Sequence, residues 1–307
     1  MREKIHRFIQ AYRMNGVVKK KTLIAVGVAL ILIILAILLL CLRPRETDTP
    51  NEPEEIIRND AVEPEDLFEP IIEPEDMEKT MKKYPDVYAW IEMPGTSDIL
   101  RTKADVSYPV AQHPTQRSFY LNHDLDGNWY QPGTLFTEAM VEGRVANSRD
   151  LNDPVTVIYG HNMANRTMFG GMQTYVEKLD LTEENLVYLY QKDRRLTYRI
   201  VGGVMYGKRH ILYYNDFADS APSPMRAGLT QGDDIFDDFF GSLWSGIYDS
   251  TYVDPDNMPV HGDRVLILLT CDNNTGNDDY RYLTICKLIE DTDELKAKAA
   301  KALKPVD

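Results

Sequence analysis

The sequence has few of the residues that usually mark a metal or cofactor site. It contains three cysteines and six histidines in 307 residues, and none of them has the paired spacing of a zinc site. A glycine-rich phosphate loop and a Gly-x-Ser-x-Gly nucleophile turn are also absent. Asp272, Asp278 and Asp279 lie close together, but their spacing does not match a calcium loop. We therefore expect no cofactor and no metal ion.

Basic residues do not form a stripe of the kind that binds nucleic acid. The net charge is −14, and much of the negative charge falls in residues 43–74, where Glu-Pro pairs recur. A segment of this composition repels itself and buries little apolar surface, so we expect an extended, disordered spacer. The charge distribution identifies no binding partner.

One long uncharged run lies near the N-terminus. Residues 22–42 contain no acidic or basic side chain and are numerous enough to cross a bilayer as a helix. A cleaved signal peptide and a retained anchor are the two interpretations, and the lack of a small-x-small cleavage site before Arg43 favours the anchor. Residues 1–21 are basic, which places the N-terminus in the cytoplasm. We expect a single-pass cell-membrane protein whose residues after Leu42 are extracytoplasmic.

The rest of the chain is expected to form one mainly β domain at residues 75–290, followed by a tail at residues 291–307. Short runs of Val, Ile, Tyr and Thr separated by turn residues predict a barrel or a sandwich. The expected strands are residues 88–93, 107–111, 134–137, 155–159, 186–190, 196–206, 265–271 and 280–289. The expected helices are residues 75–83, 168–179 and 233–244, and a marginal one at residues 294–304. Apolar residues spaced along the third helix, as far as Ile247, are expected to face the core.

Three residues in this domain suggest acyl transfer. Cys271 ends an apolar strand, Arg281 begins the next strand, and His161 follows the apolar run 155–158. A thiol needs a cationic neighbour or a base to become a nucleophile. An imidazole can exchange the protons, and a guanidinium can stabilise the oxyanion of a tetrahedral intermediate. Each residue alone also fits a structural role, so the interpretation depends on the three acting together.

The other cysteine outside the uncharged run, Cys286, admits two interpretations. Cys286 could form a disulfide with Cys271, since both lie in the part expected to be extracytoplasmic. Alternation along the strand, however, places Arg281 and Cys286 on opposite faces. If Arg281 faces Cys271, then Cys286 faces away. We therefore expect Cys286 to be a small buried hydrophobic residue.

His123 is the rival to His161 as the catalytic base. It stands between Asn122 and Asp124, a setting more typical of a loop histidine whose hydrogen bonds are already satisfied. Three further histidines lie beside polar or turn-like residues and are expected to be solvated: His113, His210 and His261.

Several short motifs follow one another in a specific order. They are Trp-Ile-Glu-Met-Pro-Gly-Thr at 90–96, Tyr-Pro-Val at 108–110, Tyr-Leu-Asn-His-Asp at 120–124, Gly-Thr-Leu-Phe at 133–136, Tyr-Gly-His-Asn-Met at 159–163 and Leu-Leu-Thr-Cys at 268–271, with Arg281 after them. In this order they resemble the class B sortases, membrane-anchored cysteine transpeptidases of Gram-positive surfaces. The resemblance covers roughly residues 75–289.

The resemblance implies a fold and a reaction. The fold is an eight-stranded sortase-type β-barrel with peripheral helices, and residues 233–244 fit the extra helix of class B. The implied catalytic residues are His161, Cys271 and Arg281, and the implied groove residues are Leu121, Tyr159 and Thr270. The enzyme would cleave a C-terminal sorting motif in a secreted protein through a cysteine thioester. It would then transfer that protein to an amine of a peptidoglycan precursor.

Two positions differ from the family pattern. Ile267 stands where the signature before the cysteine has threonine, and Gln116-Arg117 stands where Asp-Asn is frequent. The first change should affect packing, because both residues are β-branched, and the second leaves substrate preference open. Two rival functions also remain: a cysteine peptidase that uses water as the acceptor, and a catalytically inactive, wall-facing binding module.

Overall fold

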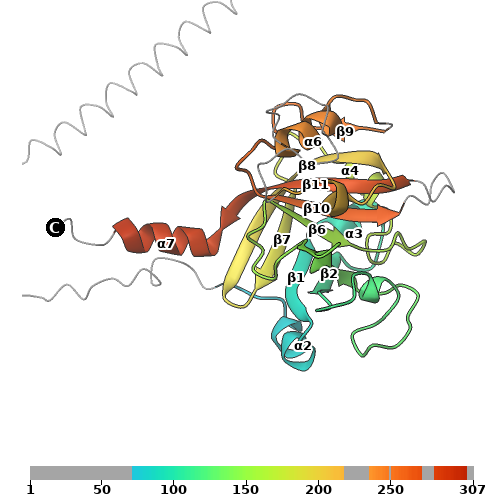
Figure 1. Cartoon of the computed structure of the whole chain (residues 1–307), viewed down its shortest axis with the longest axis vertical. Helices are drawn as coiled ribbons and strands as arrows, with labels where there is room; N and C mark the ends of the chain where they lie inside the picture. Colours follow the sequence, from blue (N-terminus) through green and yellow to red (C-terminus); the bar gives the residue numbers. More distant parts are fainter. Residues whose placement is uncertain (1–70, 218–234, 249, 272–279, 303–307) are drawn as a thin grey trace, which may run out of the picture. The chain divides into compact units, whose positions relative to one another are not determined.

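The structure is a computed structural model that describes residues 71–217, 235–248, 250–271 and 280–302 (Figure 1). The helices are α2 (Met77–Lys83), α3 (Thr96–Leu100), the 3-10 helix η2 (Phe119–Leu121), α4 (Met172–Val176), α5 (Ile211–Tyr214), α6 (Ile235–Trp244) and α7 (Thr292–Ala302). The strands are β1 (Val87–Met93), β2 (Val106–Ala111), β3 (Leu135–Phe136), β4 (Met140–Val141), β5 (Arg144–Val145), β6 (Val155–Tyr159), β7 (Leu186–Gln191), β8 (Arg194–Gly207), β9 (Tyr252–Val253), β10 (Val265–Cys271) and β11 (Tyr280–Asp291).

Eight of these strands form a closed barrel. Their order is β11-β10-β6-β3-β2-β1-β7-β8, and β8 also pairs with β11, which closes the ring. The short strand β9 is a ninth member that pairs only with β8. Pairs β6–β10 and β2–β3 are parallel, and the other pairs in the ring are antiparallel. The prediction of an eight-stranded barrel with peripheral helices is confirmed, and the sandwich alternative is wrong.

Two hydrophobic clusters lie on the two faces of the barrel wall. The inner cluster contains buried residues from all eight strands of the ring, so it fills the barrel. The outer cluster joins β6, β8, β10 and β11 to helices α5 and α6. Strand β10 contributes to both, because Leu266 and Leu268 belong to the inner cluster while Ile267 and Leu269 belong to the outer one. This alternation is the period of a strand buried on both faces.

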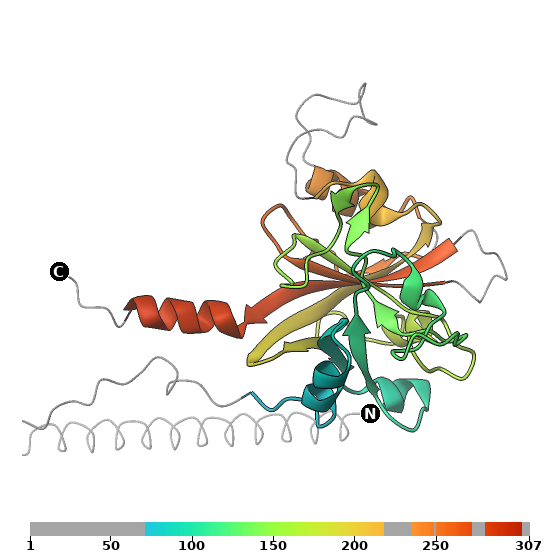
Figure 2. The same cartoon turned by 60° about the horizontal axis from the view of Figure 1, so that its bottom comes forward.

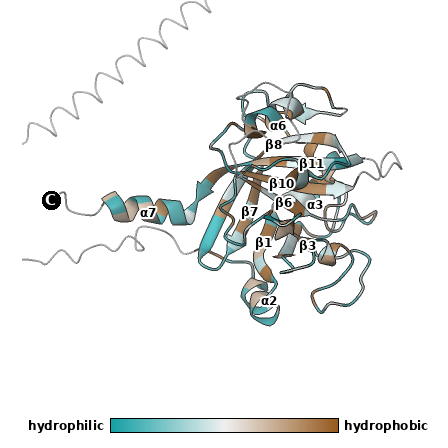
Figure 3. Ribbon diagram, in the orientation of Figure 1, coloured by the Kyte–Doolittle hydropathy of each residue, from teal (hydrophilic) through white to brown (hydrophobic). Residues whose placement is uncertain are grey.

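The barrel strands and the last helix differ in hydropathy. Figure 3 shows hydrophobic colours on β10 and β6 and more hydrophilic colours on α7. Helix α7 continues directly from β11 (Figure 2) and has no buried residue. Its composition therefore matches a helix that packs little against the core.

One expected helix is much shorter than predicted, and one expected core residue lies beyond the end of its helix. The helix expected at residues 168–179 is only α4, because Met168 and Gly171 have positive φ angles of 57° and 80°, which no α-helix allows. Helix α6 ends at Trp244, two residues before Gly246, whose φ is 73°. Ile247 is consequently 72% exposed and does not face the core. Residues 233 and 234 lie outside the described residues.

The far end of the barrel from Arg281 is held by a buried ionic network. Asp291 is the last residue of β11, and its side chain is 1% exposed. Arg194, the first residue of β8, donates to it from Nη2 at 2.6 Å, and Arg264, just before β10, donates from Nη1 at 2.8 Å. The network thus ties together three adjacent strands of the ring.

The expected membrane span, residues 22–42, lies outside the described residues. Among the helices of the described ranges, none combines the length and the apolar character that a membrane crossing requires.

Candidate active site

Strand pairing places Cys271 opposite Arg281. Cys271 is the last residue of β10, and its Cα partner on the antiparallel strand β11 is Arg281. Cα atoms of directly opposed residues on antiparallel strands lie about 4.5–5.5 Å apart. The side chain of Cys271 and residues 272–279, which include Asp272, Asp278 and Asp279, lie outside what the structure describes.

A second pairing brings the backbone of His161 to the same edge of the barrel. Strand β6 runs parallel to β10, with Tyr159 and Leu269 as Cα partners, and Gly160 N donates to Leu269 O at 3.0 Å. His161 lies two residues beyond Tyr159, just as Cys271 lies two residues beyond Leu269. Parallel strands end at the same edge of a sheet, so this register places both residues at one end of the barrel.

The ring of His161 makes a defined hydrogen bond. Its Nε2 lies 2.7 Å from Leu121 O. A carbonyl oxygen can only accept, so Nε2 carries the proton and donates it. The backbone carbonyl of His161 in turn accepts from Phe169 N at 3.0 Å, which fixes the loop behind the ring. This hydrogen bond brings Leu121, a predicted groove residue, into contact with the predicted base. The side chain of Leu121 is 40% exposed.

Arg281 lies on the outer face of the barrel wall. Leu283 and Ile285, two and four residues further along β11, belong to the outer cluster, whereas Tyr282 belongs to the inner one. The guanidinium is half-buried, and its Nη1 donates to Tyr280 O at 2.7 Å. A guanidinium carries several N–H donors, and such a group can contact a carbonyl or an oxyanion.

Cys286 occupies the opposite face, as the alternation predicts. It is fully buried in the inner cluster and is a free thiol. Its Cα partner is Leu266, five residues before Cys271 on β10. Burial raises the pKa of the Cys286 thiol, which keeps it protonated and unreactive. The prediction of a small buried hydrophobic residue is confirmed, and the disulfide alternative is wrong.

Of the two other predicted groove residues, Thr270 is buried and Tyr159 is partly buried. Thr270 is 2% exposed, and its hydroxyl has no hydrogen-bond partner among the described residues. Any contact of Thr270 with a peptide would therefore use its backbone. Tyr159 stacks on Phe136 with ring centroids 5.2 Å apart. Burial, together with the nearby Glu138 carboxylate, raises the pKa of Tyr159 well above its ordinary value.

The rival base, His123, is already engaged. Its Nδ1 donates to Phe119 O at 2.7 Å, and its ring stacks on the Phe119 ring at a centroid distance of 4.2 Å. The interpretation of His123 as a loop histidine with satisfied hydrogen bonds is confirmed.

His210 is not solvated, and this prediction is wrong. Its Nδ1 accepts from Tyr213 N at 3.1 Å as the N-cap of α5, so Nε2 bears the proton and donates to Glu138 at 2.7 Å. The Glu138 side chain is 4% exposed, and Arg117 Nε lies 3.5 Å from its other oxygen. Sequence reasoning missed this group because Glu138 and His210 are 72 positions apart.

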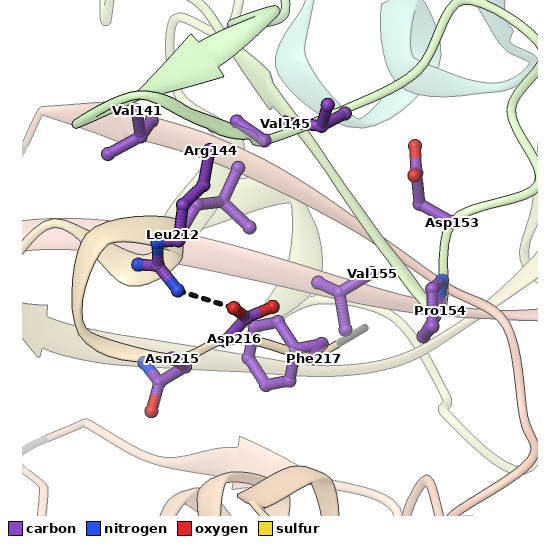
Figure 4. A pocket seen from close by; sticks show the side chains of 11 residues that line it. Val141, Arg144, Val145, Asp153, Pro154, Val155, Leu212, Asn215, Asp216 and Phe217 are labelled. Atoms are coloured by element: carbon purple, nitrogen blue, oxygen red, sulfur yellow. Dashed lines mark hydrogen bonds and ion pairs between the residues drawn. The ribbon is translucent and has the colours of Figure 1, made fainter. Parts of the chain in front are cut away.

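Cavities lie at several places on the described surface. Figure 4 shows one of about 80 Å³ between the β4–β5 hairpin and α5, crossed by an ion pair of 2.6 Å from Arg144 to Asp216. None of the six predicted site residues lines it. No group of three or more metal-ligating side chains occurs among the described residues.

Comparison with known proteins gives a consistent set of relatives. A scan against protein-family models finds no match. Sortase B of Staphylococcus aureus is 21% identical over 216 residues, covering 70% of this chain and 74% of that protein. Sortase B of Listeria monocytogenes is 24% identical over 202 residues, covering 64% and 70%. These likenesses support the resemblance to class B sortases, and the activity they indicate is that of a cysteine transpeptidase.

Solved structures include similar chains as well. A mutant form of Clostridium perfringens sortase B is 20% identical, with a TM-score of 0.49, over 69% of this chain and 86% of the other. A Streptococcus pyogenes class B sortase involved in pilus biogenesis is 18% identical, with a TM-score of 0.48, over 70% and 98%.

Proposed function

We propose that the protein is a membrane-anchored cysteine transpeptidase of the class B sortase type, with His161, Cys271 and Arg281 as its catalytic residues. The observation that carries the proposal is the strand register around β10. The last residue of β10, Cys271, is paired with Arg281 on β11. On its other side β10 pairs in parallel with β6, the strand that precedes His161. Nucleophile, base and oxyanion donor need this kind of common edge.

The proposed reaction has two halves. The Cys271 thiol gives its proton to His161, the resulting thiolate attacks the carbonyl carbon of the scissile amide, the carbon–nitrogen bond breaks, and a thioester forms. The proton on His161 Nε2, which Leu121 O accepts in the resting structure, goes to the leaving amine. An acceptor amine then attacks the thioester, gives its proton to His161 and releases the thiolate. Arg281 stabilises the oxyanion in both halves.

The substrates and the location belong to the same proposal. We infer that the donor is a secreted protein with a C-terminal sorting motif and that the acceptor is an amine of a peptidoglycan precursor. Residues 22–42 would anchor the enzyme, with its catalytic domain outside the cytoplasm. Leu121 and Tyr159 would contact the donor peptide, and Thr270 would do so through its backbone.

The decisive test is Cys271→Ala in the full chain. We expect this variant to lose cleavage of sorting-motif peptides, presented as a peptide library or as secreted substrate proteins. Its thermal unfolding should be unchanged. Full cleavage activity in this variant would refute the proposal. Mass spectrometry of the wild-type products, with and without added amine, separates transpeptidation from hydrolysis. An inactive binding module would form no thioester with any peptide.

A further inference from the structure

A positively lined cavity lies beside the loop that follows His161. Its volume is about 450 Å³, and residues 100–105 and 164–167 form most of its wall. The second segment belongs to a loop closed by a bridge between Asn162 and Met168. The loop begins one residue after His161, and the first of its residues to line the cavity, Ala164, is three positions from the predicted base.

Three cations line the cavity: Arg101, Lys103 and Arg166. One acidic side chain, Asp105, also lines it, so the formal charge of the lining is +2. Neither Arg101 nor Lys103 forms an ion pair with any residue that the structure describes. The chain as a whole has a net charge of −14, but the positive charge of this cavity favours the binding of an anion there.

The acidic residue of the cavity is occupied elsewhere. The two carboxylate oxygens of Asp105 accept from Gly95 N at 3.1 Å and from Ser97 N at 2.7 Å. These bonds hold the start of α3. Asp105 therefore already has its partners, and the three cations are not neutralised by it through a direct ion pair.

The two arginines share an unusual backbone conformation, and one of them is also hydrogen-bonded to the backbone. Arg101 and Arg166 have φ angles of 58° and 63°, a left-handed conformation that is unfavourable for arginine. Arg166 Nη1 donates to Leu100 O, so this side chain joins the two segments that form the cavity. The rest of its guanidinium fork remains for a ligand.

We propose that this cavity binds a phosphate-bearing ligand. A phosphomonoester or diphosphate carries about two negative charges at neutral pH, which matches the formal charge of the lining. Guanidinium groups bind phosphate oxygens with two parallel hydrogen bonds, and a lysine adds a point charge. Resting on the function proposed above, we take the ligand to be the acceptor substrate, whose phosphate group the cavity would hold.

The test measures binding of inorganic pyrophosphate by calorimetry to the full chain in nonionic detergent, at fixed ionic strength. We expect saturable binding that is roughly tenfold weaker or more in Arg101→Gly and in Lys103→Gln. Arg101 is the left-handed C-cap residue of α3, where glycine is preferred, so Arg101→Gly should keep the fold. The matched control is Lys298→Gln on α7, whose side chain is 74% exposed, and it should bind as the wild type does.

Competition identifies the source of the phosphate. Mixed micelles containing phosphatidic acid will displace pyrophosphate better than inorganic phosphate if the ligand is lipid-linked, and no better if it is soluble. The inference is overturned if pyrophosphate does not bind saturably or if all the variants bind equally. Cys271→Ala should retain binding, so loss of the proposed activity and loss of this site are separate outcomes.

Discussion

The substitution Asp291→Asn tests how the closed barrel is stabilised. Asp291 Oδ1 accepts from Arg194 Nε at 3.1 Å and from Asp293 N at 3.1 Å, and Oδ2 accepts from Arg194 Nη2 at 2.6 Å and Arg264 Nη1 at 2.8 Å. An asparagine keeps one acceptor oxygen and turns an amide nitrogen toward arginine donors. Removing one partner of a buried ion pair costs about 3–5 kcal/mol. We expect a loss of unfolding free energy in that range at pH 7.

The same carboxylate makes the cost depend on pH. Burial alone would raise the pKa of Asp291, but hydrogen bonds from Arg194 and Arg264 outweigh it, and the pKa falls from its ordinary 3.8 to about 2. Each pKa unit corresponds to about 1.4 kcal/mol, so the carboxylate contributes roughly 2 kcal/mol. Since the folded pKa is the lower one, this contribution is complete above about pH 5 and is lost as the pH falls toward 2.

The assay is urea unfolding followed by tryptophan fluorescence. All three tryptophans, Trp90, Trp129 and Trp244, lie in the described domain, so the signal reports this domain. The difference in unfolding free energy between wild type and Asp291→Asn should narrow by roughly 2 kcal/mol between pH 5 and pH 2. Asp256→Asn, at an exposed position, is the control and should show no such trend. A difference that stays constant with pH would refute the reasoning.

Three further predictions concern the site. Arg281→Ala should lower kcat several hundredfold, as loss of one oxyanion donor does. Arg281→Lys should restore little of that activity, because a point charge does not replace a planar fork. Steady-state kinetics with a sorting-motif peptide measure both effects, and full rescue by lysine would contradict the prediction. In Gly160→Ala the new Cβ would meet Leu135 at 2.4 Å and Phe169 at 2.6 Å. We therefore expect a loss of about 1–3 kcal/mol in unfolding free energy together with a lower kcat. Unchanged kinetics would show that the backbone at Gly160 does not determine the position of His161. Cys286 should resist alkylation in the folded protein and react in urea, since burial raises its pKa and excludes reagent; mass spectrometry of the labelled peptides reports it, and rapid native labelling would show that this part of the barrel opens.

The strands were predictable because each is a short apolar run bounded by turn residues. The eight predicted strands all exist, and most differ from the observed ones by only one or two residues at an end. What the sequence could not supply is which strands are neighbours. The parallel pair β6–β10 joins segments about 110 residues apart, and no local pattern encodes such a pairing. Only this pairing places the end of β6, which precedes His161, beside the end of β10.

The failures were of two physical kinds. The helix after His161 was overestimated because composition does not reveal a left-handed backbone at a non-glycine residue such as Met168. The partner of His210 was missed because hydrogen bonding to a buried carboxylate depends on tertiary structure. Both errors concern conformations or contacts that the polypeptide adopts only once the barrel has formed.

Ile267 shows how a departure from the family pattern can follow from packing. Its side chain is fully buried in the outer cluster, where helix α6 supplies Phe239 and Phe240. A threonine at this position would bury a hydroxyl among aromatic and aliphatic groups, at a cost of about 1–3 kcal/mol unless it found a partner. Isoleucine keeps the β-branched shape of threonine and adds apolar contact. Strand alternation repeats every two residues, so Ile267, Leu269 and the register position of Cys271 share one face of β10. Isoleucine at position 267 therefore adds apolar packing on the face of the strand that leads to the predicted nucleophile. It does not change the chemistry of that nucleophile.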